Sequence, residues 1–303
     1  MKKAAAFLTS LDKLYWPDEG ITKGDLINYY ETMATYVIPY LKNRPLSLKR
    51  NPNGIKDQGF FHKDAGDIAP DWIKTADIYA ESSDKIIHYL VCNNLKSLLF
   101  IANLGCIEMN PWNSTVTHLE KPDYLILDID PSDDNSYDDV IDVALATKEV
   151  LDRLKITGCC KTSGASGMHV YIPLHHKYDY DLVRDFAKML ATMVHDIIPA
   201  GTTLERSISK RKKNEVYIDY LQNSRGQTLA SAYSVRPKPG ATVSAPLEWQ
   251  EVKRGLHPSK FTIKNMKKRV DKKGDLFQHA LEKGIDVPAT IKQIEKLQQQ
   301  LAE

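Results

Sequence analysis

This 303-residue sequence has no CxxC motif, no long apolar run and no strong net charge. The four cysteines form no CxxC pair, which argues against a zinc site and favours reduced core thiols; they are Cys92, Cys106, Cys159 and Cys160. No apolar run approaches the ~20 residues needed to span a bilayer. The apolar run Ala4–Leu8 is too short for a secretory signal, and charge returns at Asp12. We therefore expect a cytoplasmic protein without a membrane partner.

The charge is unevenly distributed along the chain. A net charge of +2 does not by itself indicate a nucleic-acid partner. Lysine and arginine, however, cluster at residues 42–50, 206–213 and 253–273, whereas acidic residues gather at 128–139. Separate basic and acidic zones can hold a polyanion beside a metal site.

Helical and strand-like patterns alternate without internal repeats. Thr22 followed by Asp25 is a helix-start signal. Apolar residues recur at helical spacing over 26–37, 140–154 and 182–194. Strand-like runs are expected at residues 46–49, 86–91, 98–101, 124–129, 168–173, 216–221 and 231–235. This mixture predicts an α/β or α+β fold with a mainly antiparallel or mixed central sheet.

The character of the chain changes beyond Lys260. A basic stretch at 264–273 is followed by short helical patterns, the last at 291–301. We expect a compact core over residues 7–260 and a basic, helical C-terminal appendage, 261–303, that packs loosely or leads to a partner.

The segment Tyr124-Leu-Ile-Leu-Asp-Ile-Asp130 carries the most informative pattern. Alternation in a strand places Asp128 and Asp130 on one face, about 7 Å apart, where they repel unless a cation lies between them. Asp219 is a single acid in a second apolar run, 216–221. Three such carboxylates suit magnesium or manganese in two-metal phosphoryl transfer. Two other interpretations are a strand end before a Pro-Ser turn and a calcium loop, although glycine and glutamate are missing at loop positions six and twelve.

Four further segments could contact phosphate or bases. Residues 161–169 are rich in glycine and hydroxyl groups, which fits either a triphosphate cradle or a plain hairpin turn. Arg236 could clamp a phosphate. Phe60 and Phe61 could stack on a base or belong to the core. The basic run at 210–213 is either a solvated loop or a polyanion contact.

Eight segments occur in an order that resembles the polymerase domain of bacterial DNA ligase D, a member of the archaeo-eukaryotic primase superfamily. They are LDKLYWP, ITKGDLINYY, KRNPNG with FFHK, GCIEMNPW, LILDIDPS, KTSGASGMHVYIPL, VYIDYLQN and AYSVRP. The resemblance covers residues 7–260. It implies an α+β fold whose primase-like catalytic core is built on mixed or antiparallel sheets flanked by helices, with an N-terminal subregion (1–85) and a catalytic core (86–260).

The resemblance also implies an activity. Such domains are nucleotidyltransferases that extend primer 3′-hydroxyls at gaps and double-strand breaks in non-homologous end joining. They add NTPs more readily than dNTPs and use two divalent ions, Mn²⁺ or Mg²⁺. The implied partners are DNA with a 5′-phosphorylated gap or overhang, the nucleotide, Ku and a DNA ligase, and we expect a monomer that works at the nucleoid.

Residue roles follow from the same resemblance. The metal and catalytic ligands fall on Asp128, Asp130 and Asp219. Nucleotide contacts fall on Lys49, Asn110, Ser163, His169 and Arg236. DNA contacts fall on Lys13, Lys23, Arg50, Phe60, Phe61, Arg211 and Lys212, with the two N-terminal lysines on a 5′-phosphate and the loop 210–213 helping to activate the complex.

The sequence departs from the family pattern at two positions. Asn110 stands where many relatives have histidine, and it can hydrogen-bond a sugar hydroxyl but carries no charge. Ser166 replaces a common lysine, which weakens one phosphate contact. Two alternatives stay open: a haloacid-dehalogenase-like phosphatase, whose motif LILDIDPS also fits, and a non-catalytic adaptor that binds DNA ends.

Overall fold

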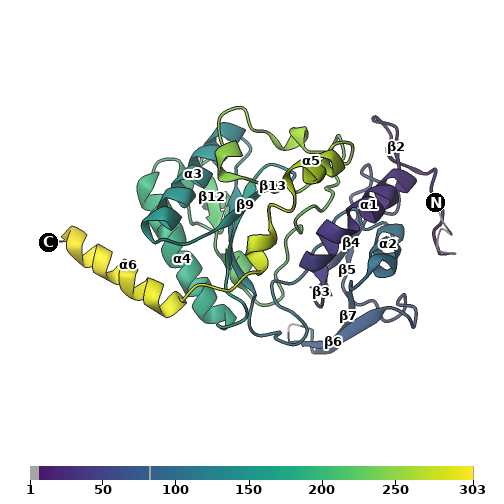
Figure 1. The fold of residues 1–303 in the computed structure, drawn as a ribbon, viewed down its shortest axis with the longest axis horizontal. Helices are drawn as coiled ribbons and strands as arrows, with labels where there is room; N and C mark the ends of the chain where they lie inside the picture. Colours follow the sequence, from purple (N-terminus) through teal and green to yellow (C-terminus); the bar gives the residue numbers. More distant parts are fainter. Residues whose placement is uncertain (1–6, 82, 303) are drawn as a thin grey trace.

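A six-stranded β-sheet occupies the middle of the computed structural model, which describes residues 7–81 and 83–302; Ala4, where the short apolar run begins, lies outside them (Figure 1). All neighbouring strands are antiparallel except the first pair, which is parallel. The order across the sheet is β11 (Thr202–Thr203), β12 (Val216–Asp219), β8 (Tyr124–Asp130), β10 (Met168–Pro173), β9 (Cys159–Thr162) and β13 (Pro246–Leu247). The expected mixed sheet is therefore confirmed.

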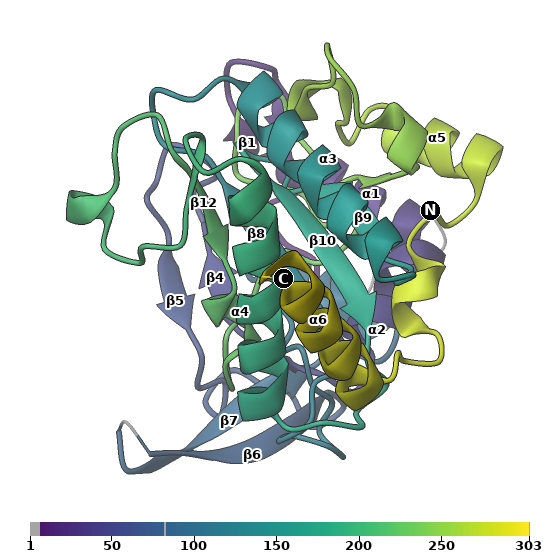
Figure 2. The ribbon, with the colours of Figure 1, turned by 90° about the vertical axis from the view of Figure 1, so that its left-hand side faces the viewer.

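Two helices, α3 (Tyr137–Arg153) and α4 (Tyr180–Ile197), cover one face of this sheet (Figure 2). Helix α3 begins at Ser136, whose side chain forms a capping box with Asp139. Because strand side chains alternate, Leu125, Leu127 and Ile129 of β8 face these helices and are fully buried. The aspartates of β8 therefore lie on the opposite face.

The N-terminal part of the chain lies on that opposite side of the sheet (Figure 1). Helix α1 (Lys23–Leu41) starts with the expected Thr22–Asp25 capping box and packs against α2 (Leu95–Asn103). Small sheets accompany the two helices: β1 (Leu14–Trp16) with β2 (Ile21–Thr22), β4 (Leu48–Arg50) with β5 (Phe60–His62), and β3 (Pro45–Leu46) with β7 (Lys85–Val91) and β6 (Lys74–Ala80).

Two of the expected strands are wrong. Residues 98–101 belong to helix α2, whose N-cap Asn94 accepts a hydrogen bond from Ser97 N. Residues 231–235 form no strand; they are linked to residues 242–245 by one bridge between Val235 and Val243 and by turn hydrogen bonds. A four-residue apolar run does not carry enough periodicity to distinguish a helix from a strand.

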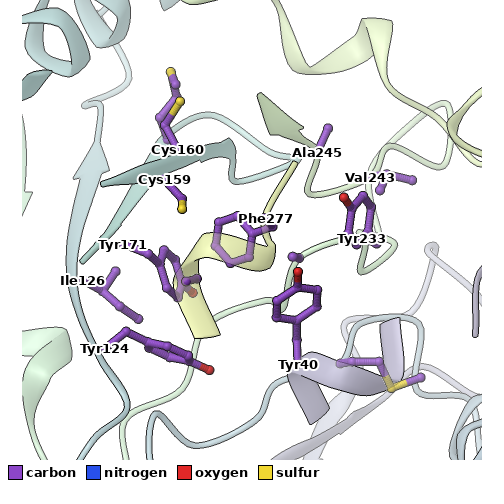
Figure 3. Packing of buried hydrophobic residues seen from close by; sticks show 14 of the residues in the cluster. Tyr40, Tyr124, Ile126, Cys159, Cys160, Tyr171, Tyr233, Val243, Ala245 and Phe277 are labelled. Atoms are coloured by element: carbon purple, nitrogen blue, oxygen red, sulfur yellow. The ribbon is translucent and has the colours of Figure 1, made fainter. Parts of the chain in front are cut away.

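The C-terminal segment is packed into the core, contrary to the expectation of loose packing. Helices α5 (Met266–Lys273) and α6 (Val287–Ala302) continue the chain, and the buried apolar residues of the segment are Phe261, Met266, Val270, Phe277, Ala280, Val287 and Ile294. Phe277 lies against Tyr40 and Tyr171, with ring centroids 5.3 and 4.9 Å apart (Figure 3). Asp275 accepts hydrogen bonds from Tyr40 and Tyr233, both at 2.7 Å.

Truncating Phe277 tests this packing. Phe277→Ala will destabilise the protein by about 3–5 kcal/mol, the usual cost of removing a buried aromatic ring. Denaturant unfolding gives the free energy, and His279→Ala, which changes an exposed neighbour, is the control. A loss below about 1 kcal/mol for Phe277→Ala would show that the segment is dispensable to the core.

No helix in the described part of the chain is long and apolar enough to cross a membrane.

Candidate functional site

Four polar residues form one row across four neighbouring strands of the six-stranded sheet. In the strand register Asp219 of β12 is opposite Asp128 of β8, Asp128 is opposite His169 of β10, and His169 is opposite Lys161 of β9. Directly paired residues in antiparallel strands project from the same face. Asp130 lies two residues beyond Asp128 and shares that face. The three aspartates are therefore close together on the face opposite α3 and α4.

Burial and mutual repulsion raise the pKa values of two of these carboxyl groups. Burial, then Asp130 and Asp219, raises the pKa of Asp128 to about 8, against the partial opposition of Lys161 and Arg236. The pKa of Asp130 is also raised, mainly by burial, while Arg211 opposes the rise. A bound cation would remove this repulsion and restore the ionised carboxylates, so the donor set fits a hard divalent ion.

The carboxylates do not form a closed cluster of ligands. Within residues 7–81 and 83–302, no group of three or more His, Cys, Asp or Glu side chains is arranged to hold a metal. One oxygen of Asp219 accepts hydrogen bonds from the Tyr217 hydroxyl and Leu221 N, and the other accepts from Gln222. These three hydrogen bonds hold the Asp219 carboxylate in place.

A cleft of about 250 Å³ opens beside the aspartates. Its walls come from the six-stranded sheet, from the β9–β10 turn and from the N-terminal part of the chain. The lining residues include Asp128, Asp130, His169, Ser163, Arg236, Asn110 and Phe61. The structure thus brings together seven of the expected site residues.

Glu108, which also lines this cleft, contacts three polar side chains. Arg236 Nε donates to Glu108 Oε2 at 2.9 Å, and Lys49 Nζ lies 3.6 Å from Oε1. Asn110 Nδ2 donates to Oε1 at 3.4 Å. Glu108 is only 6% exposed, so its charge is compensated by the two cations around it. This carboxylate fixes Arg236, which lines the cleft, and pairs with Lys49, which lies outside the lining.

The glycine-rich segment is the turn between β9 and β10, as the hairpin interpretation expected, and it also lines the cleft. Ser163 Oγ accepts hydrogen bonds from Ala165 N and Gly167 N. A Cβ on Gly167 would lie 2.2 Å from the Ile129 carbonyl oxygen. Glycine is therefore required at that position, because the turn passes directly over the end of β8.

His169 is held between Asp128 and Lys161. Its Nε2 lies 3.4 Å from Asp128 Oδ1, and its Nδ1 lies 2.7 Å from Lys161 Nζ. Burial lowers the pKa of His169 well below its ordinary value, and Lys161 and Arg236 lower it further. The imidazole is therefore neutral and has one donor and one acceptor nitrogen.

The two phenylalanines of β5 are exposed, which rules out the core interpretation. Phe60 is 49% and Phe61 64% exposed, although both sit in a strand. The Arg50 guanidinium lies 5.4 Å from the centre of the Phe60 ring, and it donates to the Leu104 carbonyl. Exposed aromatic rings beside a polar cleft offer a stacking surface.

The remaining basic residues lie outside the cleft lining. Lys23 begins α1 and its backbone N–H donates to the carbonyl of Lys13, which precedes β1; burial and then Lys13 lower the pKa of Lys23. Arg211 donates to the carbonyls of Glu205 and Arg206 and stacks on Tyr217, 3.7 Å from the ring centre. Lys212 is exposed and pairs with Glu215 at 3.1 Å.

Two residues of the site, Glu108 and Lys161, were missed in the sequence analysis. Each is a charged residue inside an otherwise apolar or small-residue segment, which is costly unless the charge has partners. That pattern was used for Asp219 and could have identified both.

Comparison with known proteins agrees with this geometry. A family model described as "LigD, primase-polymerase domain" matches residues 22–277. The "Bifunctional non-homologous end joining protein LigD" of Bacillus subtilis is 33% identical over 270 residues, which are 89% of this chain and 43% of that protein. The "Multifunctional non-homologous end joining protein LigD" of Pseudomonas aeruginosa is 28% identical over 86% of this chain and 30% of that protein.

A solved structure is similar over nearly the whole chain. The "Polymerase Domain from Mycobacterium tuberculosis Ligase D in complex with DNA" superimposes with a TM-score of 0.84 and 26% identity, covering 93% of this chain and 100% of that one. The chain thus spans less than half the length of these two curated relatives but all of the solved polymerase domain. It belongs to the LigD primase-polymerase domain family and is therefore a nucleotidyltransferase.

Proposed function

We propose that this domain extends DNA ends at gaps and double-strand breaks in non-homologous end joining, adding NTPs more readily than dNTPs to a primer 3′-hydroxyl. The observation that carries the proposal is the row of Asp219, Asp128 and His169 across three neighbouring strands, with Asp128 and His169 lining a polar cleft. The names of the relatives support the repair context. Ku and a DNA ligase are the proposed partners, and the nucleoid is the proposed place of action.

Asp128, Asp130 and Asp219 are the proposed ligands of two divalent ions, Mn²⁺ or Mg²⁺. Asp128 and Asp130 would hold both ions, and Asp219 would hold the one nearer the primer. When bound, such ions neutralise the triphosphate and make the primer hydroxyl a better nucleophile. The raised pKa of Asp128 supports this assignment, because three uncompensated carboxylates repel one another in the absence of a cation.

The chain's own residues would orient the reacting groups. Arg236, Lys49 and Ser163 would hold the triphosphate, and the neutral His169 would donate a hydrogen bond to a phosphate oxygen. Asn110 would hydrogen-bond a sugar hydroxyl. The primer hydroxyl then loses its proton to water as its oxygen attacks the α-phosphorus in line; a new O–P bond forms, the bond to the bridging oxygen breaks, and pyrophosphate leaves.

DNA would approach along the N-terminal side of the cleft. Phe60 and Phe61 are the proposed stacking surface for a template base, with Arg50 beside them. Lys13 and Lys23, which are adjacent, would bind a downstream 5′-phosphate. Arg211 and Lys212 would contact the DNA from the loop before β12.

The test is extension of a gapped duplex with a 5′-phosphate on its downstream strand. The protein should add NTPs in the presence of Mn²⁺ or Mg²⁺, with lower efficiency for dNTPs, and a 5′-hydroxyl duplex should be a poorer substrate. Tight binding of the 5′-phosphorylated duplex without any incorporation would instead favour the non-catalytic adaptor.

Removing the exposed aromatic rings tests template contact. Phe60→Ala and Phe61→Ala will each lower templated incorporation about tenfold, since base stacking on an aromatic ring contributes about 1–3 kcal/mol. Thermal stability should stay unchanged, because both rings are largely exposed. Leu145→Ala, an exposed apolar residue on α3, is the control. Full templated activity in both phenylalanine variants would exclude these rings as the template contact.

A further inference from the structure

Asn103, the last residue of α2, holds the chain segment that precedes β1. Its side-chain oxygen accepts a hydrogen bond from Thr9 N at 3.0 Å, and its side-chain nitrogen donates to the Phe7 carbonyl oxygen at 2.8 Å. One amide group therefore pairs with a backbone N–H and a backbone carbonyl two residues apart, as a residue of a neighbouring strand would. These contacts tie residues 7–9 to α2, although more than 90 residues separate them in the sequence.

An aromatic cluster holds the same segment beside Asn103. The Phe7 ring stacks on Trp72, with centroids 5.5 Å apart, and meets the edge of the Phe100 ring at 5.8 Å. Phe100 belongs to α2 and lies one helical turn before Asn103. Residues 7–9 are therefore fixed by two kinds of contact, one through the backbone and one through a side chain.

This segment reaches the ammonium group of Lys23. The Thr9 carbonyl oxygen accepts a hydrogen bond from Lys23 Nζ at 2.9 Å. Lys23 is only 5% exposed, and within residues 7–81 and 83–302 this carbonyl is the one hydrogen-bond partner of its ammonium. An ammonium has three N–H donors, so two are left over. A buried lysine is costly unless its donors have partners, and an anion beside Lys23 would use both.

The backbone of α1 closes the other end of the segment. Lys23 N donates to the Lys13 carbonyl and Gly24 N donates to the Leu11 carbonyl, each at 2.8 Å. A Cβ on Gly24 would lie 3.1 Å from the Leu11 carbonyl oxygen, so the chain passes close to the first turn of the helix. Residues 7–13 therefore form a strap that α2 holds at one end and α1 holds at the other.

We propose that Asn103 is a positioning residue for an anion site at Lys23 and Lys13. By holding Thr9 N, it keeps the Thr9 carbonyl on one N–H of Lys23 and leaves the other two N–H groups to the anion in a fixed direction. The anion is the downstream 5′-phosphate of a DNA end, an identity that rests on the proposed function. Asn103 acts on it only through the strap.

Fluorescence anisotropy with two gapped duplexes tests this proposal without a catalytic assay. The duplexes differ only in a 5′-phosphate or a 5′-hydroxyl on the downstream strand, and the ratio of their Kd values measures the preference for phosphate. Asn103→Leu keeps the size of the side chain and removes both hydrogen bonds to the strap. We expect it to lower the preference about fivefold, because Lys23 keeps its charge but loses the contact that directs it.

Three further variants separate positioning from loss of stability. Asn94→Ala removes the N-cap of the same helix and destabilises it, but leaves the contacts of residues 7–9 intact and should keep the wild-type preference. Lys23→Met removes the ammonium, and adding Asn103→Leu to it should lower the preference no further, because both changes act through one group. Phe7→Ala loosens the same strap through the aromatic cluster and should lower the preference as Asn103→Leu does.

The outcomes distinguish this inference from the proposed function. If the wild type prefers the 5′-phosphate through Lys23 while folded Asn103→Leu and Phe7→Ala proteins keep that preference, the inference alone is overturned. A wild type without any preference, or one that Lys23→Met leaves unchanged, would contradict the 5′-phosphate site as well. Equal losses in Asn94→Ala and Asn103→Leu would reveal a general effect of helix stability and would also overturn the inference. If Asn103→Leu does not fold, Phe7→Ala decides the question.

Discussion

Replacing Asp128 with asparagine will lower nucleotide incorporation by at least about 10³-fold, since the variant loses a charged ligand for ions that stabilise the transition state by several kcal/mol. DNA affinity should stay within about threefold of the wild type, because Asp128 makes no proposed DNA contact. Primer extension and fluorescence anisotropy measure the two quantities. An equal loss of incorporation and DNA binding would contradict this division of roles.

The same substitution will stabilise the metal-free protein at high pH. The pKa of Asp128 is higher in the folded protein, about 8, than in the unfolded chain, about 4, so its contribution to stability is present at low pH and is lost as the pH rises through 8. Asparagine has the same shape and does not ionise. In EDTA at pH 9 we expect Asp128→Asn to be more stable by about 1–3 kcal/mol, with the difference disappearing toward pH 4. A variant that is less stable at pH 9 would contradict the assigned repulsion.

Arg236→Ala should have the next largest effect, an increase of about 100-fold in KM for the NTP, because a charge-assisted clamp on phosphate is lost. It will also lower stability by about 2 kcal/mol, since Glu108 loses the closer of its two cations. The two effects can be separated in a second variant. Arg236→Ala combined with Glu108→Gln should recover much of the stability and none of the nucleotide affinity.

Arg236→Lys is the matched control for geometry. Lysine keeps the charge but not the planar fork that donates to Glu108 and to the Ser163 carbonyl, so KM should rise by about tenfold. Steady-state titration of NTP at saturating DNA measures these values. An unchanged KM in Arg236→Ala would exclude this arginine from the nucleotide site.

The three aspartates could be predicted from the sequence because strand alternation determines the face of each side chain. Asp128 and Asp130 share a face in any strand that contains them both, and Asp219 was the single acid in another apolar run. The pairing of the two runs is not encoded in a local pattern. The register that places Asp219 opposite Asp128 is a property of the folded sheet.

The same limit hid the partners of Glu108 and Lys161, although each residue stands out as a charge in an otherwise apolar or small-residue segment. Glu108 is 128 residues away from its partner Arg236 in the sequence, and Lys161 is 83 residues away from its partner Ser244. No local spacing indicates contacts over such distances. The C-terminal segment was misjudged for a related reason. Its many lysines suggest a solvated surface, whereas Arg269 and Lys273 pair with Glu251 while Met266 and Val270 face the core.

Residue types alone also left two alternatives, one removed by family membership and the other by the secondary structure. A phosphatase that uses the first aspartate of LILDIDPS as a nucleophile is wrong, because the chain belongs to the primase-polymerase domain family. The calcium loop is wrong as well, since Tyr124–Asp130 is a strand and Tyr137–Arg153 is a helix.

Anomalous diffraction from crystals grown with Mn²⁺ and a non-hydrolysable NTP tests the central claim most directly. We expect manganese peaks about 2 Å from carboxylate oxygens of Asp128 and Asp130, with the Asp219 carboxylate released from Gln222 and turned toward one ion. The triphosphate should lie against Arg236. Manganese bound elsewhere, with these three carboxylates free of metal while nucleotide fills the cleft, would contradict it.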